Sequence, residues 1–285
     1  MQNIKAILGK NQPGLLQTLI KSQEQRECIS CGKVFTATTW LRPDGSELPP
    51  GSKCRSCVDN ERDMEKLHEL ELQLPESDAK TREWWRVSSG IPELSLEKTF
   101  DNFNKERQAI AFNSMHILAW KFGGSLVLSS PGTYGVGKTH LVIALANHVM
   151  NTEPAAYILD GLIRRHPNPV YFTTENMMLR RIRNTFDKDS QETEEDVYRA
   201  MARVDLLIVD DVGKVRPRDM SFTQSVYFNI IDQRYCDHKP VVMTTNLDFS
   251  ALEEHIGGAC ADRLREMCGR AGLVKMSGES YRRTL

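Results

Sequence analysis

Residues 132–139 read Gly-Thr-Tyr-Gly-Val-Gly-Lys-Thr, a complete G-x-x-x-x-G-K-[ST] phosphate-binding loop. An apolar run at 125–129 precedes the loop and a helical pattern at 138–150 follows it, which disfavours a chance Gly-rich turn. A loop so placed points backbone N–H groups and the positive end of a helix dipole at one anion. Lys138 is expected to reach the β- and γ-phosphates, and the Thr139 hydroxyl to ligate Mg²⁺. The sequence therefore predicts that ATP is bound by Gly132, Thr133, Tyr134, Gly135, Val136, Gly137, Lys138, Thr139 and His140.

The composition is that of an ordinary globular protein: 285 residues, 40% hydrophobic, 26% charged and a formal net charge of −1. Nucleic-acid binding would therefore have to come from local basic patches. No apolar run approaches the length of a membrane span, and no signal peptide opens the chain. We expect a cytoplasmic protein with no membrane partner.

Four of the seven cysteines, Cys28, Cys31, Cys54 and Cys57, form two C-x₂-C pairs separated by a turn-rich segment. Two such pairs can complete a closed tetrahedral zinc site, and zinc would then supply the folding free energy of a small module. The alternatives are redox-active or unpaired thiols, or His68 as a substitute ligand. Cys236, Cys260 and Cys268 are expected to be buried apolar residues.

We predict three parts: an N-terminal arm and zinc-binding module at 1–60, a helical linker at 61–83 and an α/β domain at 84–285. Residues 1–22 have a helical pattern broken at Pro13-Gly14, and 75–79 resembles a linker. In the α/β domain, apolar runs alternate with helical segments, which is typical of a mainly parallel sheet. Strands are predicted at 125–129, 169–173, 205–210, 240–244 and 273–276, and helices near 104–121, 138–150, 175–186, 193–202 and 221–236.

Two of these strands end in polar residues. An apolar run ends in Asp210 and Asp211, and this position suits Asp210 to Mg²⁺ binding and Asp211 to orienting and deprotonating the attacking water. The alternative is a strand that merely ends in a polar turn. A second run ends in Asn246, which could position the water or contact the γ-phosphate, or could simply form an Asx turn or cap.

Arginines provide the remaining candidate residues. Arg263 could act as an arginine finger on the γ-phosphate of an adjacent subunit, or could form a surface salt bridge with Asp262 or Glu266. The densest basic clusters are Arg164-Arg165-His166 and the group of Arg180, Arg181 and Arg183. The second could follow a phosphate backbone or could be a solvated helix face.

The segment from about 88 to 283 resembles the DnaC/DnaI/IstB family of AAA+ ATPases. The resemblance rests on Gly135-Val136-Gly137-Lys138-Thr139-His140-Leu141, on Leu207-Ile208-Val209-Asp210-Asp211-Val212-Gly213 and on Thr244-Thr245-Asn246, Asp262-Arg263-Leu264 and Gly278-Glu279-Ser280-Tyr281-Arg282-Arg283. It implies an AAA+ P-loop core, an arginine finger at Arg263 and a sensor-2-like role for Arg282. It also implies a single-strand channel lined by the helix that carries Arg180, Arg181 and Arg183. The segment 153–168 is longer than usual for the family.

The resemblance implies a homo-oligomeric ATPase that loads a hexameric replicative helicase onto single-stranded DNA during DNA replication, using ATP, Mg²⁺ and Zn²⁺. In DnaI-like members the N-terminal zinc module contacts the helicase. The alternative is an IstB-like transposition helper ATPase that assembles on duplex DNA and recruits a transposase. A third hypothesis is a nucleotide-gated adaptor with little hydrolysis.

Overall fold

The computed structural model describes residues 19–42, 45–121, 124–214 and 219–281. The chain divides into two compact units, Met1–Leu72 and Gln73–Leu285. Their boundary falls within the segment 61–83 that was expected as a linker. Residues 1–18, most of the N-terminal arm, and Arg282 lie outside the described residues.

The smaller unit contains a three-stranded antiparallel sheet of β1 (Leu19–Glu27), β2 (Val34–Leu41) and β3 (Glu47–Leu48), in that order. The β-branched and aromatic residues of 34–41 favour this strand conformation. The helical pattern predicted to continue through 19–22 is wrong, because these residues pair with β2. The turn between β1 and β2 carries Cys28 and Cys31, and Cys54 and Cys57 lie at the start of α1.

Helix α1 (Arg55–Ser88) starts in the smaller unit and its residues from Gln73 onward belong to the larger one. The prediction of a linker at 75–79 is wrong, because the helix continues through Pro75. A proline inside a helix removes one hydrogen bond and costs about 3 kcal/mol. Ion pairs one turn apart support the following segment, Glu76 with Lys80 and Asp78 with Arg82, each at 2.6 Å.

The larger unit is built around a parallel five-stranded sheet, which confirms the predicted fold class. Its strands are β4 (Leu126–Ser129), β7 (Val170–Thr174), β8 (Leu206–Val212), β9 (Val241–Thr245) and β10 (Leu273–Lys275). The spatial order is β10-β4-β9-β8-β7. All five predicted strands are present, and β9 separates the strand before the phosphate loop from the strand that ends in the two aspartates.

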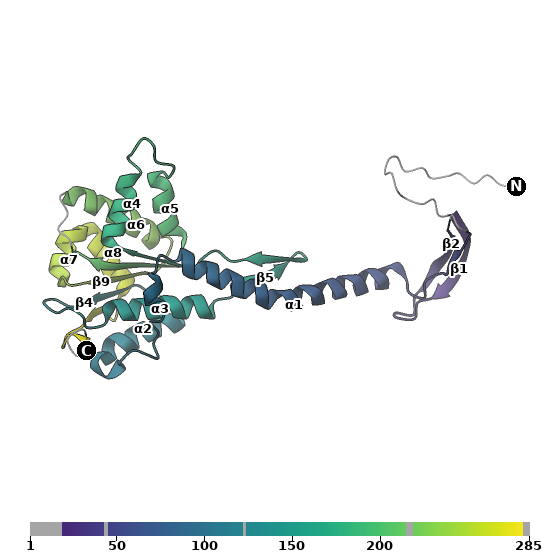
Figure 1. Ribbon diagram of the computed structural model, residues 1–285, viewed down its shortest axis with the longest axis horizontal. Coiled ribbons are helices and arrows are strands. Elements are labelled where there is room, and N and C mark those ends of the chain that lie inside the picture. The colour runs from purple at the N-terminus through teal and green to yellow at the C-terminus, as the bar shows by residue number, and fades with distance from the viewer. Residues whose placement is uncertain (1–18, 43–44, 122–123, 215–218, 282–285) are drawn as a thin grey trace. The chain divides into compact units, whose positions relative to one another are not determined.

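Helices cover both faces of this sheet (Figure 1). One face carries α2 (Ala109–Lys121) and α3 (Lys138–Thr152), and Leu126, Leu128 and Ile208 pack there in one apolar cluster. The other face carries α4 (Glu175–Asn184), α5 (Glu194–Arg203), α6 (Met220–Cys236), α7 (Phe249–Ile256) and α8 (Gly258–Cys268). Val127, Leu207 and Val209 pack into that second cluster. Alternate residues of each strand thus pack into opposite apolar clusters, because successive side chains of a strand point to opposite faces of the sheet.

The segment 153–168, which is long for the resembling family, forms a separate two-stranded hairpin. Its strands are β5 (Ala156–Leu159) and β6 (Leu162–Arg165), and they precede β7. Two short 3₁₀ helices, Glu93–Ser95 and Lys105–Gln108, lie between α1 and α2. Because the five core strands are parallel, their carboxyl ends meet at one edge of the sheet, where parallel α/β sheets bind ligands.

Candidate nucleotide-binding site and metal site

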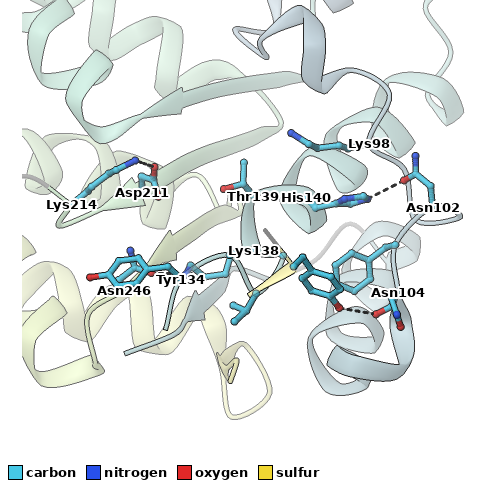
Figure 2. Close-up of a pocket in the computed structure, with 15 residues that line it drawn as sticks. Lys98, Asn102, Asn104, Tyr134, Lys138, Thr139, His140, Asp211, Lys214 and Asn246 are labelled. Carbon is cyan, nitrogen blue, oxygen red and sulfur yellow. Dashed lines mark hydrogen bonds and ion pairs between the residues drawn. The ribbon is translucent and has the colours of Figure 1, made fainter. Parts of the chain in front are cut away.

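A cavity of about 480 Å³ lies at the carboxyl edge of the sheet (Figure 2). Most of the phosphate loop forms one wall, and the opposite wall comes from the segment before α2 and from Tyr281. The lining residues are Lys98, Asn102, Phe103, Asn104, Tyr134, Gly135, Val136, Gly137, Lys138, Thr139, His140, Asp211, Lys214, Asn246 and Tyr281. The predicted residues Gly132, Thr133 and Asp210 do not line the cavity directly.

At Gly137 the backbone of the phosphate loop has a conformation that only glycine adopts readily. Gly137 has φ of +98°, and a Cβ atom there would lie 2.7 Å from the ring of Phe103. Helix α3 begins at the next residue, Lys138, so its amino end points at the cavity. The Lys138 side chain is buried, and its ammonium donates to Asn246 Oδ1 at 2.6 Å and to the Ser130 hydroxyl. The structure thus brings Lys138 and Asn246 together.

Asp210 lies directly behind the loop. Thr139 Oγ1 donates to its Oδ2 at 3.0 Å, and the Thr244 hydroxyl donates to its Oδ1. Burial raises the pKa of the Asp210 carboxyl, although the bonds from Thr244 and Thr139 and the charge of Lys138 oppose this. The two oxygen groups predicted to bind Mg²⁺ are therefore adjacent, which is the donor set a hard cation prefers.

Asp211 faces the cavity because the strand changes register beneath it. The pairing of β8 with β9 is irregular between Val209 and Val212, and Asp211 has φ of +58°. Its N–H donates to Thr244 Oγ1 at 3.0 Å, and its carboxylate forms an ion pair with Lys214 at 2.6 Å. Such a bulge re-aims a side chain, so consecutive aspartates serve different positions: Asp210 behind the loop and Asp211 in the cavity.

Glu175, which the sequence reasoning missed, supports the turn after Asp211. This side chain, 3% exposed, accepts from the Gly213 N–H at 2.9 Å through Oε2. Its Oε1 lies 2.8 Å from the Tyr227 hydroxyl and 2.7 Å from His255 Nε2. Burial, with the neighbouring Glu175, holds the pKa of Tyr227 well above its usual value. The only sequence signal was an acidic residue at the first position of the predicted helix 175–186.

The far wall of the cavity is aromatic and amide-rich. His140 Nε2 lies 2.9 Å from the Thr99 carbonyl and 3.0 Å from Asn102 Oδ1, and burial lowers its pKa. Phe103 contacts the rings of both His140 and Tyr281. The Tyr281 N–H donates to the Gly135 carbonyl at 3.0 Å, which joins the closing segment to the phosphate loop. Site reasoning missed Lys98, Asn104 and Lys214, because isolated polar residues in loops carry no pattern.

Arg263 lies on α8 and does not line the cavity of its own chain. Its guanidinium forms an ion pair with Asp232 at 2.8 Å and lies over the ring of Phe228 at 5.2 Å. The alternative partner Asp262 pairs instead with Arg265. Arg263 is therefore held in place on the surface of α6 and α8.

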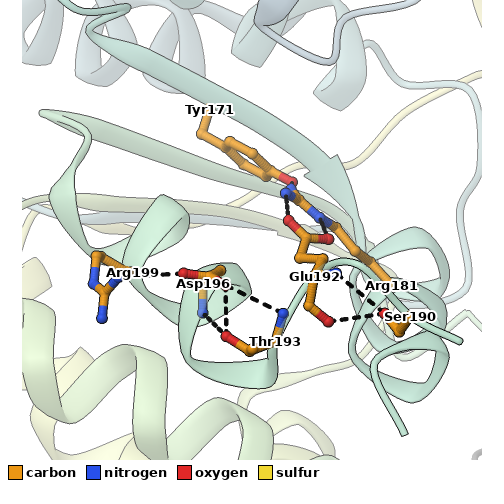
Figure 3. Close-up of polar contacts among 7 residues, drawn as sticks. All are labelled: Tyr171, Arg181, Ser190, Glu192, Thr193, Asp196 and Arg199. Atoms are coloured by element: carbon orange, nitrogen blue, oxygen red, sulfur yellow. Dashed lines mark hydrogen bonds and ion pairs between the residues drawn. The ribbon is translucent and has the colours of Figure 1, made fainter. Parts of the chain in front are cut away.

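The three arginines of α4 have different surroundings. Arg181 is engaged within the fold: its Nε donates to Glu192 Oε2 at 3.0 Å and its guanidinium lies over the Tyr171 ring (Figure 3). The hydrogen bond with Glu192 raises the pKa of Arg181 above its usual value. Arg183 lies 4.9 Å from the centre of the Phe222 ring, and Arg180 is exposed. Arg180 and Arg183 thus present charge outward, while Arg181 ties α4 to the segment before α5.

The four N-terminal cysteines lie close together, with all of their sulfur atoms within 4.8 Å of one another. Cys31 Sγ and Cys54 Sγ are 3.7 Å apart, against about 3.8 Å for two sulfurs on one tetrahedral zinc with bonds of about 2.3 Å. The Cys54 N–H donates to Cys28 Sγ at 3.3 Å and, as the largest cause, lowers the pKa of Cys28 to about 6. The cluster fits zinc without His68. Cys260 and Cys268 are buried as expected, but the prediction for Cys236 is wrong, since it is exposed.

Comparison with known proteins identifies the class. Residues 94–285 match the family described as IstB-like ATP-binding proteins, and the chain belongs to that family. Among curated relatives, the replicative helicase loader DnaC of Buchnera aphidicola subsp. Baizongia pistaciae is 27% identical over 203 residues, covering 69% of this chain and 74% of the relative.

Solved structures support the same fold. A crystal structure of the DnaC helicase loader superposes with a TM-score of 0.51 at 19% identity, covering 65% of this chain and all of that one. The replication initiator DnaA, bound to AMPPCP and single-stranded DNA, gives a TM-score of 0.50 at 19% identity, covering 64% of this chain and 50% of that one. The larger unit therefore shares the fold of these structures, a parallel sheet with helices on both faces and a phosphate loop at its carboxyl edge. Among the helices of the described segments, none combines the length and apolar character needed to cross a membrane.

Proposed function

We propose that this protein is an oligomeric AAA+ ATPase that uses ATP to load a replicative helicase onto single-stranded DNA in the cytoplasm. The carrying observation is a cavity that gathers Lys138, Thr139, Asp211 and Asn246 at the carboxyl edge of a parallel sheet. A relative named as a replicative helicase loader supports the choice of partner. We also propose the division into an N-terminal arm and zinc module, a helical linker and the ATPase domain.

In this proposal Lys138 binds the β- and γ-phosphates from the loop. Thr139 and Asp210 would hold Mg²⁺, which neutralises charge on the phosphates when bound. Asp211 orients the attacking water and takes its proton, and Asn246 fixes the position of that water or of the γ-phosphate. Because Asp211 pairs with Lys214 at 2.6 Å, that ion pair has to open before Asp211 can accept a proton.

The site is completed by a neighbouring subunit. Arg263 lies outside its own cavity, on a helix surface where Asp232 and Phe228 fix its direction. We propose that it acts as an arginine finger, adding positive charge at the γ-phosphate of the adjacent subunit. Arg282 would contact the nucleotide in a sensor-2-like role. ATP would then bind at a subunit boundary, and hydrolysis would weaken that boundary.

The two remaining surfaces are assigned to partners. The zinc module, held by Cys28, Cys31, Cys54 and Cys57, would contact the hexameric helicase. Arg180 and Arg183 on α4 would follow the phosphates of single-stranded DNA. Arg181 is the third arginine predicted for this role; it is bonded to Glu192, and its contact with DNA stays a prediction.

The decisive experiment combines turnover with loading. The intact protein should hydrolyse ATP and transfer a hexameric helicase onto a circular single strand. Asp211→Asn should lower the hydrolysis rate about 100-fold or more while nucleotide binding, followed with a fluorescent ATP analogue, remains. Replacing Cys28 and Cys31 by Ser should abolish capture of the helicase and leave turnover without DNA unchanged. Normal capture by that variant would exclude the zinc module as the helicase contact.

A second function is that of a transposition helper that assembles on duplex DNA, and the match to the family of IstB-like ATP-binding proteins supports it. Filaments on duplex DNA in the absence of any helicase, visible by negative-stain microscopy, would support it over loading. The adaptor hypothesis, with little hydrolysis, would be supported if the intact protein and Asp211→Asn turned over ATP equally slowly.

A further inference from the structure

The hairpin of β5 and β6 is an insertion that the nucleotide site does not use. Its strands pair in the register Tyr157 with Arg164 and Leu159 with Leu162, joined by Asp160-Gly161, both at positive φ. Two central residues at positive φ form the tight turn that matches strand twist. The register places Tyr157, Leu159, Leu162 and Arg164 on one face, since cross-strand partners share a face.

The root of the hairpin is fixed to α1. Asp78 Oδ1 accepts from the N–H groups of Ala155 at 2.8 Å and Ala156 at 3.1 Å. On the outgoing strand, the indole of the buried Trp85 donates to the His166 carbonyl at 3.2 Å. Both strands are therefore anchored where they leave the core, and the hairpin projects as a fixed element (Figure 1).

Within the described chain, the face shared by Tyr157 and Arg164 is largely exposed, although the ring of His166 lies against Tyr157. Tyr157 is 36% exposed, Leu159 49% and Leu162 51%. A two-stranded ribbon is at best marginally stable in water, and leaving its apolar side exposed forgoes the burial that would stabilise it. Of the strand residues of the hairpin only Ala156 is buried, so most of the hairpin contributes little to the core and its exposed face is available to a ligand.

The charges on the hairpin indicate the chemistry of that ligand. Within the described residues, neither Arg164 nor Arg165 forms an ion pair, whereas Arg181 on α4 is held by Glu192. The centres of the Tyr157 and His166 rings are 4.4 Å apart, so His166 packs against the phenol ring. Arg164 is the cross-strand partner of Tyr157 and shares its face, whereas Arg165 pairs with Ala156 on the opposite face. A cation without an ion-pair partner beside a partly exposed aromatic ring matches a chain of phosphates carrying unpaired bases.

We propose that this hairpin binds single-stranded DNA, with Tyr157 stacking on a base and Arg164 contacting a phosphate. The proposal rests on the proposed function, in that it supplies a second contact for the strand beyond α4. The hairpin leads into the amino end of β7, whereas the nucleotide cavity lies at the carboxyl ends of the strands. Substitutions in the hairpin should therefore leave ATP binding intact.

The test is a titration of a fluorescently labelled oligo-dT with the full-length protein and ATP, by anisotropy at several salt concentrations. Tyr157→Ala should weaken binding about tenfold. Arg164→Gln should lower the slope of log affinity against log salt by about 0.7, the value for one lost phosphate contact on a single strand. The controls are Arg165→Gln, on the opposite face of the hairpin, and Arg203→Gln, at another exposed arginine. Each removes the same charge as Arg164→Gln and should retain the parent slope.

Three results would overturn the proposal. Tyr157→Ala and Arg164→Gln variants that bind oligo-dT with the parent affinity and slope would exclude the hairpin as a DNA contact. If those variants also lost the helicase, the hairpin would be a protein-docking element instead. If the intact protein bound no oligo-dT but hydrolysed ATP normally, both this proposal and the DNA part of the proposed function would fail while the ATPase assignment stood. Unchanged ATP turnover without DNA would show that each variant is folded.

Discussion

Asp211 is an uncommon residue in its backbone geometry as well as in its position. A φ of +58° is unfavourable for most residues, but aspartate tolerates it better than most. The conformation is maintained from both sides, by the Thr244 hydroxyl at the Asp211 N–H and by Glu175 at the Gly213 N–H. Local strain of this kind persists only when its surroundings impose it, so the residues around Asp211 control its carboxylate.

The substitution Glu175→Gln should test whether these neighbours hold the Asp211 carboxylate in position. The glutamine can still accept one bond, but its amide cannot serve Gly213, Tyr227 and His255 together, so the turn carrying Asp211 should loosen. Given the proposed ATPase activity, we expect kcat to fall about 10- to 100-fold with the Kd for a fluorescent ATP analogue changed less than twofold. Both values can be measured on one preparation.

The matched control for that substitution is Glu195→Gln, which neutralises an exposed glutamate paired with Arg199 on α5. It should leave kcat unchanged. If Glu175→Gln lowered the free energy of unfolding but not kcat, Glu175 would be a structural residue only.

How far the sequence predicts single residues depends on whether their partners are local. Lys138 and Thr139 are specified by eight consecutive residues, so their positions follow from the motif. Arg234 is the opposite case: fully buried, it donates to the carbonyls of Met201, Ala202, Val204, Asp205 and Pro240. Those five carbonyls lie in two separate segments, so only the folded chain shows why an arginine belongs there.

At the scale of elements, the parallel strands were predictable because each is a short, continuous apolar run. The β5–β6 hairpin was not, because its residues are partly exposed and its two strands are four residues each. The continuity of α1 through Pro75 was also missed, because ion pairs and contacts in the following turns outweigh the local penalty. Elements that are stabilised by tertiary contacts cannot be predicted from the local sequence pattern alone.

Asp78, which anchors the hairpin, predicts that the stability of the fold depends on pH. Burial raises the pKa of Asp78, but Arg82 and the N–H groups of Ala155 and Ala156 outweigh it, so the folded-state pKa is lowered. A lowered pKa stabilises the fold at pH values above the unfolded pKa of about 3.9. That contribution is lost as the pH falls through the folded-state value.

Asp78→Asn should therefore lower the free energy of unfolding by about 1–2 kcal/mol at pH 7, and by progressively less below about pH 4. Urea denaturation at a series of pH values measures both effects. Glu76→Gln, which removes the exposed i,i+4 partner of Lys80, is the control and should cost about 0.5 kcal/mol or less. A destabilisation by Asp78→Asn that did not change with pH would contradict the role of its charge.

For the whole molecule, the two compact units predict separate responses to metal and nucleotide. In the proposed function the small sheet with four clustered thiols draws its stability from zinc, whereas the larger unit has two apolar cores of its own. Calorimetry of the full chain should show a transition that disappears with a strong chelator. A second transition should shift upward with ATP, by about 2.7 kcal/mol at 100 times the Kd.

The matched variant is Cys31→Ser, which should remove the chelator-sensitive transition and keep the ATP-dependent shift. If chelation and ATP instead moved one common transition, the two units would unfold together and the independence inferred from their separate cores would be wrong.

The strand order also has a consequence for how the protein is made. β4, which leads into the phosphate loop, is flanked by β9 and β10, and both neighbours follow it far along the chain. A growing polypeptide therefore contains the complete nucleotide motif long before it contains the strands that support it. Closing such long loops is slow, so the ability to hold ATP should be among the last properties that a newly synthesised molecule acquires.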